Sequence, residues 1–177
     1  TAKDVHIYKV DLTLEEDIIK LTTRLESDFG RVDVLVHSAG VISLDPVESA
    51  DIHDFDRQFL TNVRAPYLLT QTLLPMLKRC QGQIVFVNSS AGLSAGANVS
   101  QYAATKHALK AMADSIRQEI NAHGVRVMSV YPGRTATPMQ KGVHDHEGKP
   151  YRPERLSQPE DVATTVIHAL SLPRTSE

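Results

Sequence analysis

The sequence predicts an α/β fold in which helices cover both faces of a doubly wound parallel sheet. Short apolar runs bounded by turn residues alternate along the chain with amphipathic stretches of helical period. This alternation is typical of strand-helix-strand units, whose crossover helices pack on the faces of a parallel sheet. The chain has 177 residues and is 41% hydrophobic, which suits one domain with a substantial core. We therefore expect a single domain over residues 1–177.

Four apolar runs have the length and composition of strands in such a sheet. They cover residues 5–10, 32–36, 84–87 and 125–131. The second run is apolar except for Asp33, as expected for a parallel strand that is buried on both faces. The first run ends at Asp11, and the second leads into the loop 37–40.

The first and last predicted helices carry recognisable N-terminal signals. Thr13 and Glu16 have the spacing of a capping box, in which each residue bonds the other's backbone N–H. Ser157 and Glu160 repeat this spacing, with Pro159 in the first turn of the helix, where proline is favoured. We therefore expect helices to begin just after residues 13 and 157.

Two longer helices are expected between them. The first covers roughly residues 54–76, with apolar residues at helical spacing and Asn62 in its interior. Pro66 and Pro75 should kink or interrupt it, because proline has no N–H for the helical ladder. The second contains Tyr102 and continues with apolar residues at intervals of three and four until Gly124.

Composition limits the partners and the compartment of the protein. The formal net charge is −2, with no long charged run, which disfavours nucleic acid and anionic membranes as partners. Cys80 is the single cysteine, so no internal disulfide can form. No apolar stretch reaches membrane-spanning length and no signal-peptide pattern opens the chain. We expect a soluble, cytoplasmic protein.

The stretch 89–106 carries the strongest chemical signal. Tyr102 and Lys106 are four residues apart on a predicted helix, so their side chains project from one face. Serines at positions 89 and 90 follow the strand 84–87, and ligands of open α/β sheets bind at the carboxyl ends of strands. Taken separately, such a Tyr/Lys pair and loop serines fit an ordinary surface equally well. Together they indicate acid/base chemistry on a carbonyl or an alcohol.

The tyrosine needs help to act as a base near neutral pH. A phenol titrates near 10, so its anion must be stabilised by about three pK units, or about 4 kcal/mol. A neighbouring ammonium favours the ionised phenol, and Lys106 is placed to supply it. A serine hydroxyl would polarise the reacting oxygen through a hydrogen bond.

This arrangement resembles the short-chain dehydrogenase/reductase family, in which Ser, Tyr and Lys act with an Asn on a nicotinamide cofactor. Ser89 stands thirteen residues before Tyr102 and three before Gly92, as in the family pattern, and Ser90 is the second choice. The resemblance covers nearly the whole chain and implies a Rossmann-like fold. The catalytic residues that it implies are Asn62, Ser89, Tyr102 and Lys106.

The resemblance also assigns contacts to the adenosine half of the cofactor. Asp11 matches an aspartate that hydrogen-bonds adenine in the family; its alternative role is that of a helix-entry residue. Ala39 and Gly40 match small residues that let the backbone approach the adenosine ribose. Ser38 replaces a family asparagine that braces the sheet, which puts that bracing in doubt.

The nicotinamide half is assigned to the Tyr/Lys pair and to the segment 132–137. In the family, the backbone near Thr135 and the hydroxyl of Thr137 contact the carboxamide, after a Pro-Gly pair that here is Pro132 and Gly133. The expected cofactor is NAD(P), with NADP slightly preferred. The implied cofactor contacts are Asp11, Ala39, Gly40, Tyr102, Lys106, Pro132, Gly133, Thr135 and Thr137.

One family motif has no match in this sequence. The G-x-x-x-G-x-G turn, which cradles the pyrophosphate, belongs between the first strand and the first helix of the fold. In the strand order 3-2-1-4-5-6, two further strands would separate the one ending at Asp11 from the one ending at Val36. We therefore expect an N-terminal β-α-β-α segment of at least ~30 residues before Thr1, and a further strand after residues 172–175.

Residues 134–156 are polar and show no clear periodicity, and we expect them to form a substrate lid loop. Lys141, Lys149 and Arg152 are its candidate anchors for a phosphate or carboxylate. His and acidic residues at 144–147 invite a metal site, but further ligands are lacking, so no metal is expected.

The favoured function is an NAD(P)-dependent oxidoreductase that interconverts an alcohol and a carbonyl in a small-molecule substrate. The resemblance further implies a homo-oligomer, either a dimer or a tetramer. One alternative is a noncatalytic sensor or scaffold that binds a dinucleotide. Another is a sugar-nucleotide epimerase or dehydratase, but such enzymes need a larger C-terminal domain than the residues after Gly133 provide.

Overall fold

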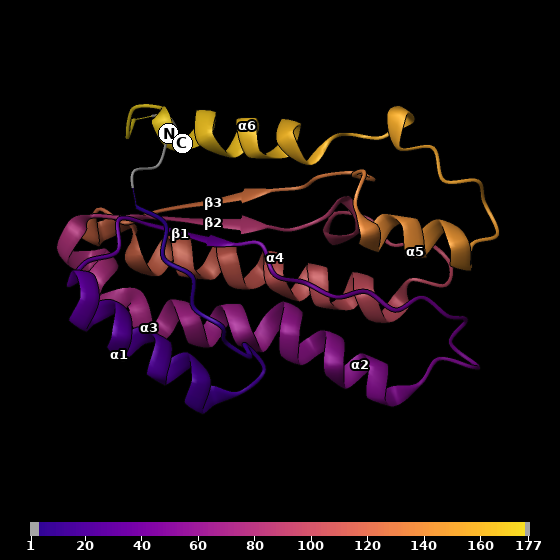
Figure 1. Ribbon diagram of the computed structural model, residues 1–177, viewed down its shortest axis with the longest axis horizontal. Coiled ribbons are helices and arrows are strands. Elements are labelled where there is room, and N and C mark those ends of the chain that lie inside the picture. Colours follow the sequence, from indigo (N-terminus) through magenta and orange to yellow (C-terminus); the bar gives the residue numbers. More distant parts are fainter. Residues whose placement is uncertain (1–3, 176–177) are drawn as a thin grey trace.

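A parallel sheet of three strands forms the centre of the computed structural model, which describes residues 4–175 (Figure 1). The strands are β1 (Val34–His37), β2 (Gln83–Val87) and β3 (Arg126–Val130), in the order β1-β2-β3. The register places Leu35 opposite Ile84, and Ile84 opposite Val127. Three of the four predicted strands and their parallel arrangement are thus confirmed.

Helices lie on both faces of this sheet. They are α1 (Glu15–Phe29), α2 (Ile52–Phe59), α3 (Ala65–Cys80), α4 (Ser100–Ile120), α5 (Pro138–His146) and α6 (Pro159–Ser171). Figure 1 shows α6 on one side of the strands and α3 and α4 on the other, with α1 packed outside α3. Within residues 4–175, no helix combines the length and the apolar character that crossing a bilayer requires.

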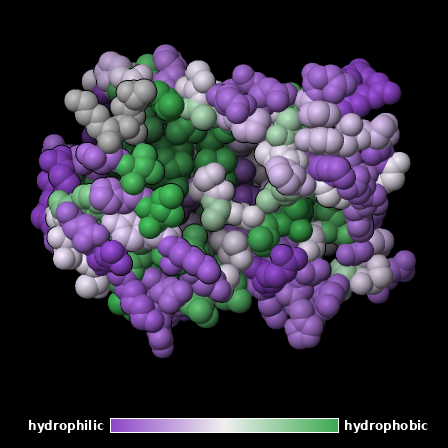
Figure 2. Space-filling view, in the orientation of Figure 1, coloured by the Kyte–Doolittle hydropathy of each residue, from purple (hydrophilic) through white to green (hydrophobic). Residues whose placement is uncertain are grey.

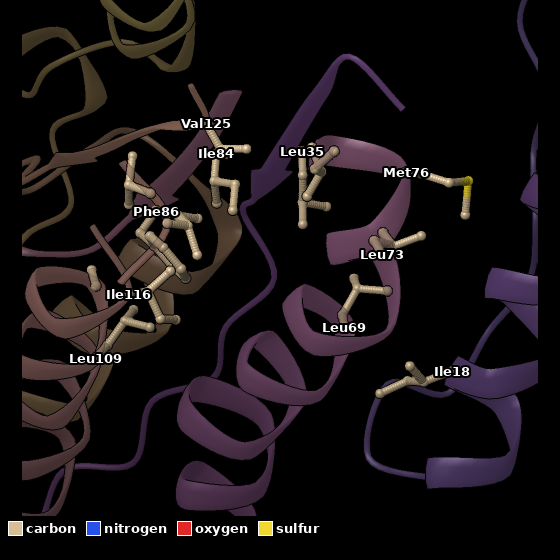
Figure 3. Close-up of a cluster of buried hydrophobic side chains, with 14 residues drawn as sticks. Ile18, Leu35, Leu69, Leu73, Met76, Ile84, Phe86, Leu109, Ile116 and Val125 are labelled. Carbon is tan, nitrogen blue, oxygen red and sulfur yellow. The ribbon is translucent and has the colours of Figure 1, made fainter. Parts of the chain in front are cut away.

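The core lies between the sheet and helices α3 and α4 (Figure 3). Ile84 and Phe86 on β2 are fully buried, and Leu69 of α3 and Leu109 of α4 point toward the strands. Ile18 of α1 extends the same cluster outward to a third helix. Each such side chain contributes about 1.5–3 kcal/mol on burial, so the apolar pattern of these helices determines how they dock.

The predicted strand at residues 5–10 is wrong, because these residues have no regular secondary structure. Val5 and Ile7 are 75% and 90% exposed. A strand exists only when its backbone groups pair with a neighbour, and the free edge of β1 does not pair with this segment. Val34 and Val36 on β1 remain about 40% exposed, and Figure 2 shows hydrophobic surface over the strands.

Neither predicted capping box is correct as stated. Thr13 donates its hydroxyl and its N–H to the Asp11 carboxylate, at 2.7 and 2.9 Å, so α1 begins only at Glu15, without a side-chain cap. The box of α6 lies one position later, between Gln158 and Asp161. Ser157 is unavailable because its backbone pairs with the strand-like segment at residues 134–136.

The long helix predicted for residues 54–76 is interrupted by a π-helical turn, Leu60–Arg64. Pro66 lacks the N–H that would bond the Asn62 carbonyl in an α-helix. The N–H of Ala65 accordingly bonds the carbonyl of Leu60, five residues earlier. The interruption expected from Pro66 is confirmed, whereas Pro75 lies inside α3 without ending it.

A buried arginine fixes α6 against the sheet. Arg126 on β3 is 4% exposed, and its guanidinium donates to the carbonyls of Ala169, Leu172 and Pro173 at 2.5–3.2 Å. These carbonyls lie at the end of α6, where the helix dipole is negative. The charge of Arg126 thus stabilises the C-terminus of α6 and holds that helix over the sheet.

A buried histidine lies at the end of β1. His37 is 9% exposed, stacks on Phe86 with ring centres 4.8 Å apart, and its Nε2 lies 2.8 Å from the Thr70 hydroxyl. Burial lowers the pKa of His37 from 6.5 to about 4. The unfolded chain therefore binds a proton at this residue at a higher pH than the folded chain.

Stability should consequently fall as the pH drops from about 6.5 to about 4, because protonation of His37 favours the unfolded state. Between pH 7.5 and pH 4.5 the free energy of unfolding should fall by about 2.5 kcal/mol more in the wild type than in His37→Gln. Urea unfolding at the two pH values measures this difference. Equal losses in both proteins would contradict the assignment.

Candidate active site

A cavity of about 500 Å³ lies at the carboxyl ends of the strands. Its walls come from the loops after β1 and β2, from the first turns of α4, and from the segment after β3. The predicted site residues that line it are Gly40, Ser89, Tyr102, Lys106, Pro132, Gly133, Thr135 and Thr137. Asp11, Ala39 and Asn62 are not part of its wall.

Tyr102 and Lys106 lie on the same face of α4, as their spacing predicts. Lys106 is 4% exposed, and its Nζ lies 5.7 Å from the centre of the Tyr102 ring. Burial lowers the pKa of Lys106 to about 8. Burial also raises the pKa of Tyr102, and a hydrogen bond with Ser89 offsets only part of this effect. The expected lowering of the Tyr102 pKa is therefore wrong for this site, where the phenol stays protonated at neutral pH.

Ser89 and Ser90 both line the cavity with Tyr102, and Ser89 is the serine whose side chain is held in place. Its Oγ accepts the N–H of Ala91 at 3.1 Å. This bond caps the short turn Ser90–Gly92 and fixes the position of the Ser89 hydroxyl. The N–H of Ser90 donates to the carbonyl of Pro132 at 3.0 Å, which places the serine turn beside the Pro-Gly segment.

Asn62 is buried, with 1% of its surface exposed, so the alternative of an exposed asparagine is excluded. Its side-chain amide accepts from the N–H of Val41 and donates to the carbonyl of Val41, both at 2.9 Å, and donates to the Thr105 hydroxyl at 3.1 Å. Asn62 thus ties the loop after β1 to α4, one residue from Lys106. Its part in a proton relay stays a prediction.

Two residues of the site were not found by sequence reasoning. Asn88 is 5% exposed and donates its side-chain N–H to the carbonyl of Lys106 at 3.1 Å, while its Oδ1 has no partner among the described residues. A Cβ on Gly92 would lie 2.6 Å from this Oδ1 and 2.9 Å from the Lys106 carbonyl. The end of β2, the serine turn and α4 therefore meet where no side chain fits. The only sequence signal is the glycine that follows the serines.

Gly92→Ala should therefore disturb the site, because backbone or a buried amide must move to admit the methyl group. We expect a loss of about 1–3 kcal/mol in the free energy of unfolding. Gly96→Ala is the matched control, since a Cβ there meets nothing within 4 Å. Urea unfolding of both variants checks this, and equal stability of the two would contradict the tight contact at Gly92.

The expected lid at residues 134–156 is not an irregular loop, because it contains α5 and the short turn Pro153–Arg155. Thr137 is the N-cap of α5, where its Oγ1 accepts the N–H of Gln140 at 3.2 Å, and Pro138 is the first helical residue. This Thr-Pro pair is a helix-start signal that the sequence contained. Contact of Thr137 with a carboxamide stays a prediction.

Three of the four side chains at 144–147 bond other protein groups. His144 is buried, with Nδ1 2.8 Å from the carbonyl of Gln140, and Asp145 pairs with Lys141 at 2.8 Å. Glu147 pairs with Arg134, and this contact lowers the pKa of Glu147 to about 2. Across residues 4–175, no three His, Cys, Asp or Glu side chains form a group that could hold a metal ion.

Two of the three residues assigned to the adenosine half, Asp11 and Ala39, lie outside the cavity. Asp11 is exposed and bonds Thr13 at the entry of α1, which is its alternative role as a helix-entry residue. Hydrogen bonds from Thr13 lower the pKa of the Asp11 carboxyl. Ala39 is also exposed. Their contacts with an adenosine group stay predictions.

Comparison with known proteins identifies the family. The sequence pattern described as short chain dehydrogenase matches residues 1–148. Cyclopentanol dehydrogenase of Comamonas is 31% identical over 173 residues, covering 94% of this chain and 69% of that protein. This chain belongs to the short-chain dehydrogenase family. The resemblance read from the Ser/Tyr/Lys pattern is thereby confirmed.

Other members of the family support the fold of this chain. Sepiapterin reductase of Chlorobaculum tepidum is 30% identical, covering 92% of this chain and 65% of that protein. A short chain dehydrogenase of Escherichia coli complexed with NADPH has a TM-score of 0.83 and 30% identity, covering 90% of this chain and 66% of that one. ElxO with NADP bound has a TM-score of 0.84 at 25% identity, covering 94% and 71%. The Rossmann-like α/β fold is confirmed.

Proposed function

We propose that the protein is an NADP-preferring oxidoreductase that interconverts an alcohol and a carbonyl. The observation that carries the proposal is the convergence of Ser89, Tyr102 and Lys106 in one cavity at the carboxyl edge of the sheet. The preference for NADP is supported by the two similar structures that were solved with NADPH and NADP. Cyclopentanol dehydrogenase, a relative, is named for an alcohol oxidation of this type.

The residues of the cavity fit a nicotinamide nucleotide. A Cβ on Gly40 would lie 3.7 Å from Lys106 Nζ, so the glycine keeps the space beside the lysine open. Lys106 has no carboxylate partner within residues 4–175, and its ammonium is free to donate to ribose hydroxyls. Thr135 and Thr137 line the same cavity. The nicotinamide ring, when bound, supplies or accepts the hydride.

The side chains of the cavity bind the substrate oxygen and transfer a proton to it. The raised pKa keeps Tyr102 protonated at neutral pH, so the phenol can donate its proton as a carbonyl is reduced. The Ser89 hydroxyl, which lines the same cavity, hydrogen-bonds the substrate oxygen and orients it. Lys106 donates hydrogen bonds to the ribose hydroxyls and stabilises the phenolate that forms. Asn62 supports the relay that passes protons between Lys106 and solvent. In the alcohol-oxidising direction the same groups act in reverse.

We further propose that the protein is a cytoplasmic homo-oligomer, a dimer or tetramer that assembles through α3 and α4. The support is exposed hydrophobic surface on α2 and α3: Phe59 and Tyr67 are 44% and 51% exposed, and Leu60 between them is 38% exposed. Light scattering on the natural polypeptide tests the assembly, and a monomer at working concentration would refute it.

Tyr102→Phe should abolish turnover in the natural polypeptide that carries this chain. Loss of the proton donor should lower kcat by about 10²–10⁴-fold, while the affinity for NADPH changes little. Tyr8→Phe is the matched control, because Tyr8 lies outside the cavity and its hydroxyl donates to the Asp28 carboxylate at 2.7 Å. NADPH oxidation with a carbonyl panel and NADPH titration measure the two effects. A wild type that binds NADPH but reduces no carbonyl would favour the noncatalytic sensor instead.

A further inference from the structure

Aliphatic side chains from three separate segments line the cavity that contains Tyr102. They are Ile42 and Leu44 from the loop after β1, Val99 just before α4, and Met139 and Val143 from α5. Leu44 and Val143 are 8% and 9% exposed, so both are fixed by packing. Figure 2 shows hydrophobic surface bordering the hollow between the strand ends and α5. Several elements thus contribute to one hydrophobic wall.

A second cavity of about 540 Å³ shares part of this wall. Gly40, Leu44, Met139 and Val143 line both cavities. The two cavities are therefore adjacent, and the cavity that contains Tyr102 reaches Met139 and Val143 of α5. A substrate whose oxygen bonds Tyr102 has room for a carbon skeleton that extends against α5.

The two arginines at these walls are already paired with carboxylates. Arg134 makes two hydrogen bonds to the Glu147 carboxylate, at 2.9 and 2.5 Å, and both residues line the first cavity. Arg57, in the second cavity, bonds Asp54 and the Ser43 hydroxyl, each at 2.7 Å. The charge of each guanidinium is thus offset by a neighbouring carboxylate, which weakens its attraction for a substrate anion.

The candidate anchors expected from the sequence lie elsewhere. Lys141, Lys149 and Arg152 line neither cavity. Lys141 pairs with Asp145, and Lys149 lies 3.0 Å from Glu147. Lys106 is next to the Tyr102 ring and is assigned to the proposed chemistry. A substrate carboxylate or phosphate would be desolvated without a cationic partner, which is strongly unfavourable.

We propose that the substrate is an uncharged aliphatic or alicyclic ketone, or the matching secondary alcohol, whose hydrocarbon body packs between the loop after β1 and α5. This proposal rests on the proposed oxidoreductase function. Asp45 in the second cavity disfavours an anion there further. The Asp54 carboxylate is engaged by Arg57, so it offers little to a cation.

Three ketones with the same six-membered ring distinguish neutral, anionic and cationic substrates. They are cyclohexanone, 4-oxocyclohexanecarboxylate and 4-aminocyclohexanone, each assayed with NADPH and the natural polypeptide at pH 7. We expect kcat/KM for the neutral ketone to exceed both charged ketones by roughly 100-fold or more. Preferred turnover of a charged ketone, lost in Tyr102→Phe, would overturn the substrate class but keep the oxidoreductase. No turnover of any ketone or aldehyde in a wider panel would overturn both.

Two variants test the neutral wall directly. Met139→Lys adds a cation to it, and Glu147→Gln releases Arg134 from its carboxylate. Each should raise kcat/KM for 4-oxocyclohexanecarboxylate relative to cyclohexanone by about tenfold or more. Gln118→Lys, which adds the same charge at an exposed position of α4 outside both cavities, should leave the ratio unchanged. Thermal melting verifies folding, and an unchanged ratio in folded Met139→Lys would contradict the proposal.

Discussion

Two buried amides, Asn62 and Asn88, hold helix α4 against the carboxyl edge of the sheet, and the site depends on this attachment. Asn62 bonds the Thr105 hydroxyl, which in turn donates to the carbonyl of Tyr102 at 2.8 Å. Asn88 bonds the carbonyl of Lys106. Hydrogen bonds between buried groups are costly to leave unmade, so α4 is fixed at the turn that carries both reactive side chains.

The same burial that fixes these side chains determines their protonation. It raises the pKa of Tyr102 and lowers that of Lys106 to about 8, so at neutral pH the phenol holds its proton and the amine is mostly charged. A protonated phenol beside an ammonium is suited to giving a proton to a carbonyl oxygen. The surrounding wall adds no free charge of its own. The unpaired charge of this cavity is therefore that of Lys106, beside the Tyr102 ring.

Local patterns in the sequence predicted the parts of this structure that local chemistry determines. The apolar run at 84–87 and the Tyr102–Lys106 spacing were correct, because buried parallel strands and helix faces follow from residue order alone. The run at 5–10 failed because an apolar pattern does not supply the neighbour that a strand needs. The hydrogen bond of Asn88 could not be predicted from the sequence, because its partner Lys106 is eighteen residues away and comes within bonding distance only after folding.

The segment from Arg134 to Met139 contributes to two different parts of the cavity wall. Its first residues face the cavity near the serine turn, and Met139 forms part of the hydrophobic wall. Backbone bonds to Ser157 hold this segment: Ala136 donates to the Ser157 carbonyl at 2.8 Å, and Ser157 donates to the Arg134 carbonyl at 3.2 Å. Arg134 also pairs with Glu147, which caps α5 and lines the cavity. The bonds to Ser157 do not involve the cavity face of α5. Substitutions on the cavity face of α5 can therefore change the shape of the hydrophobic wall while the backbone beside Tyr102 stays in place. The residues that select the substrate are thus different from those proposed to transfer the proton.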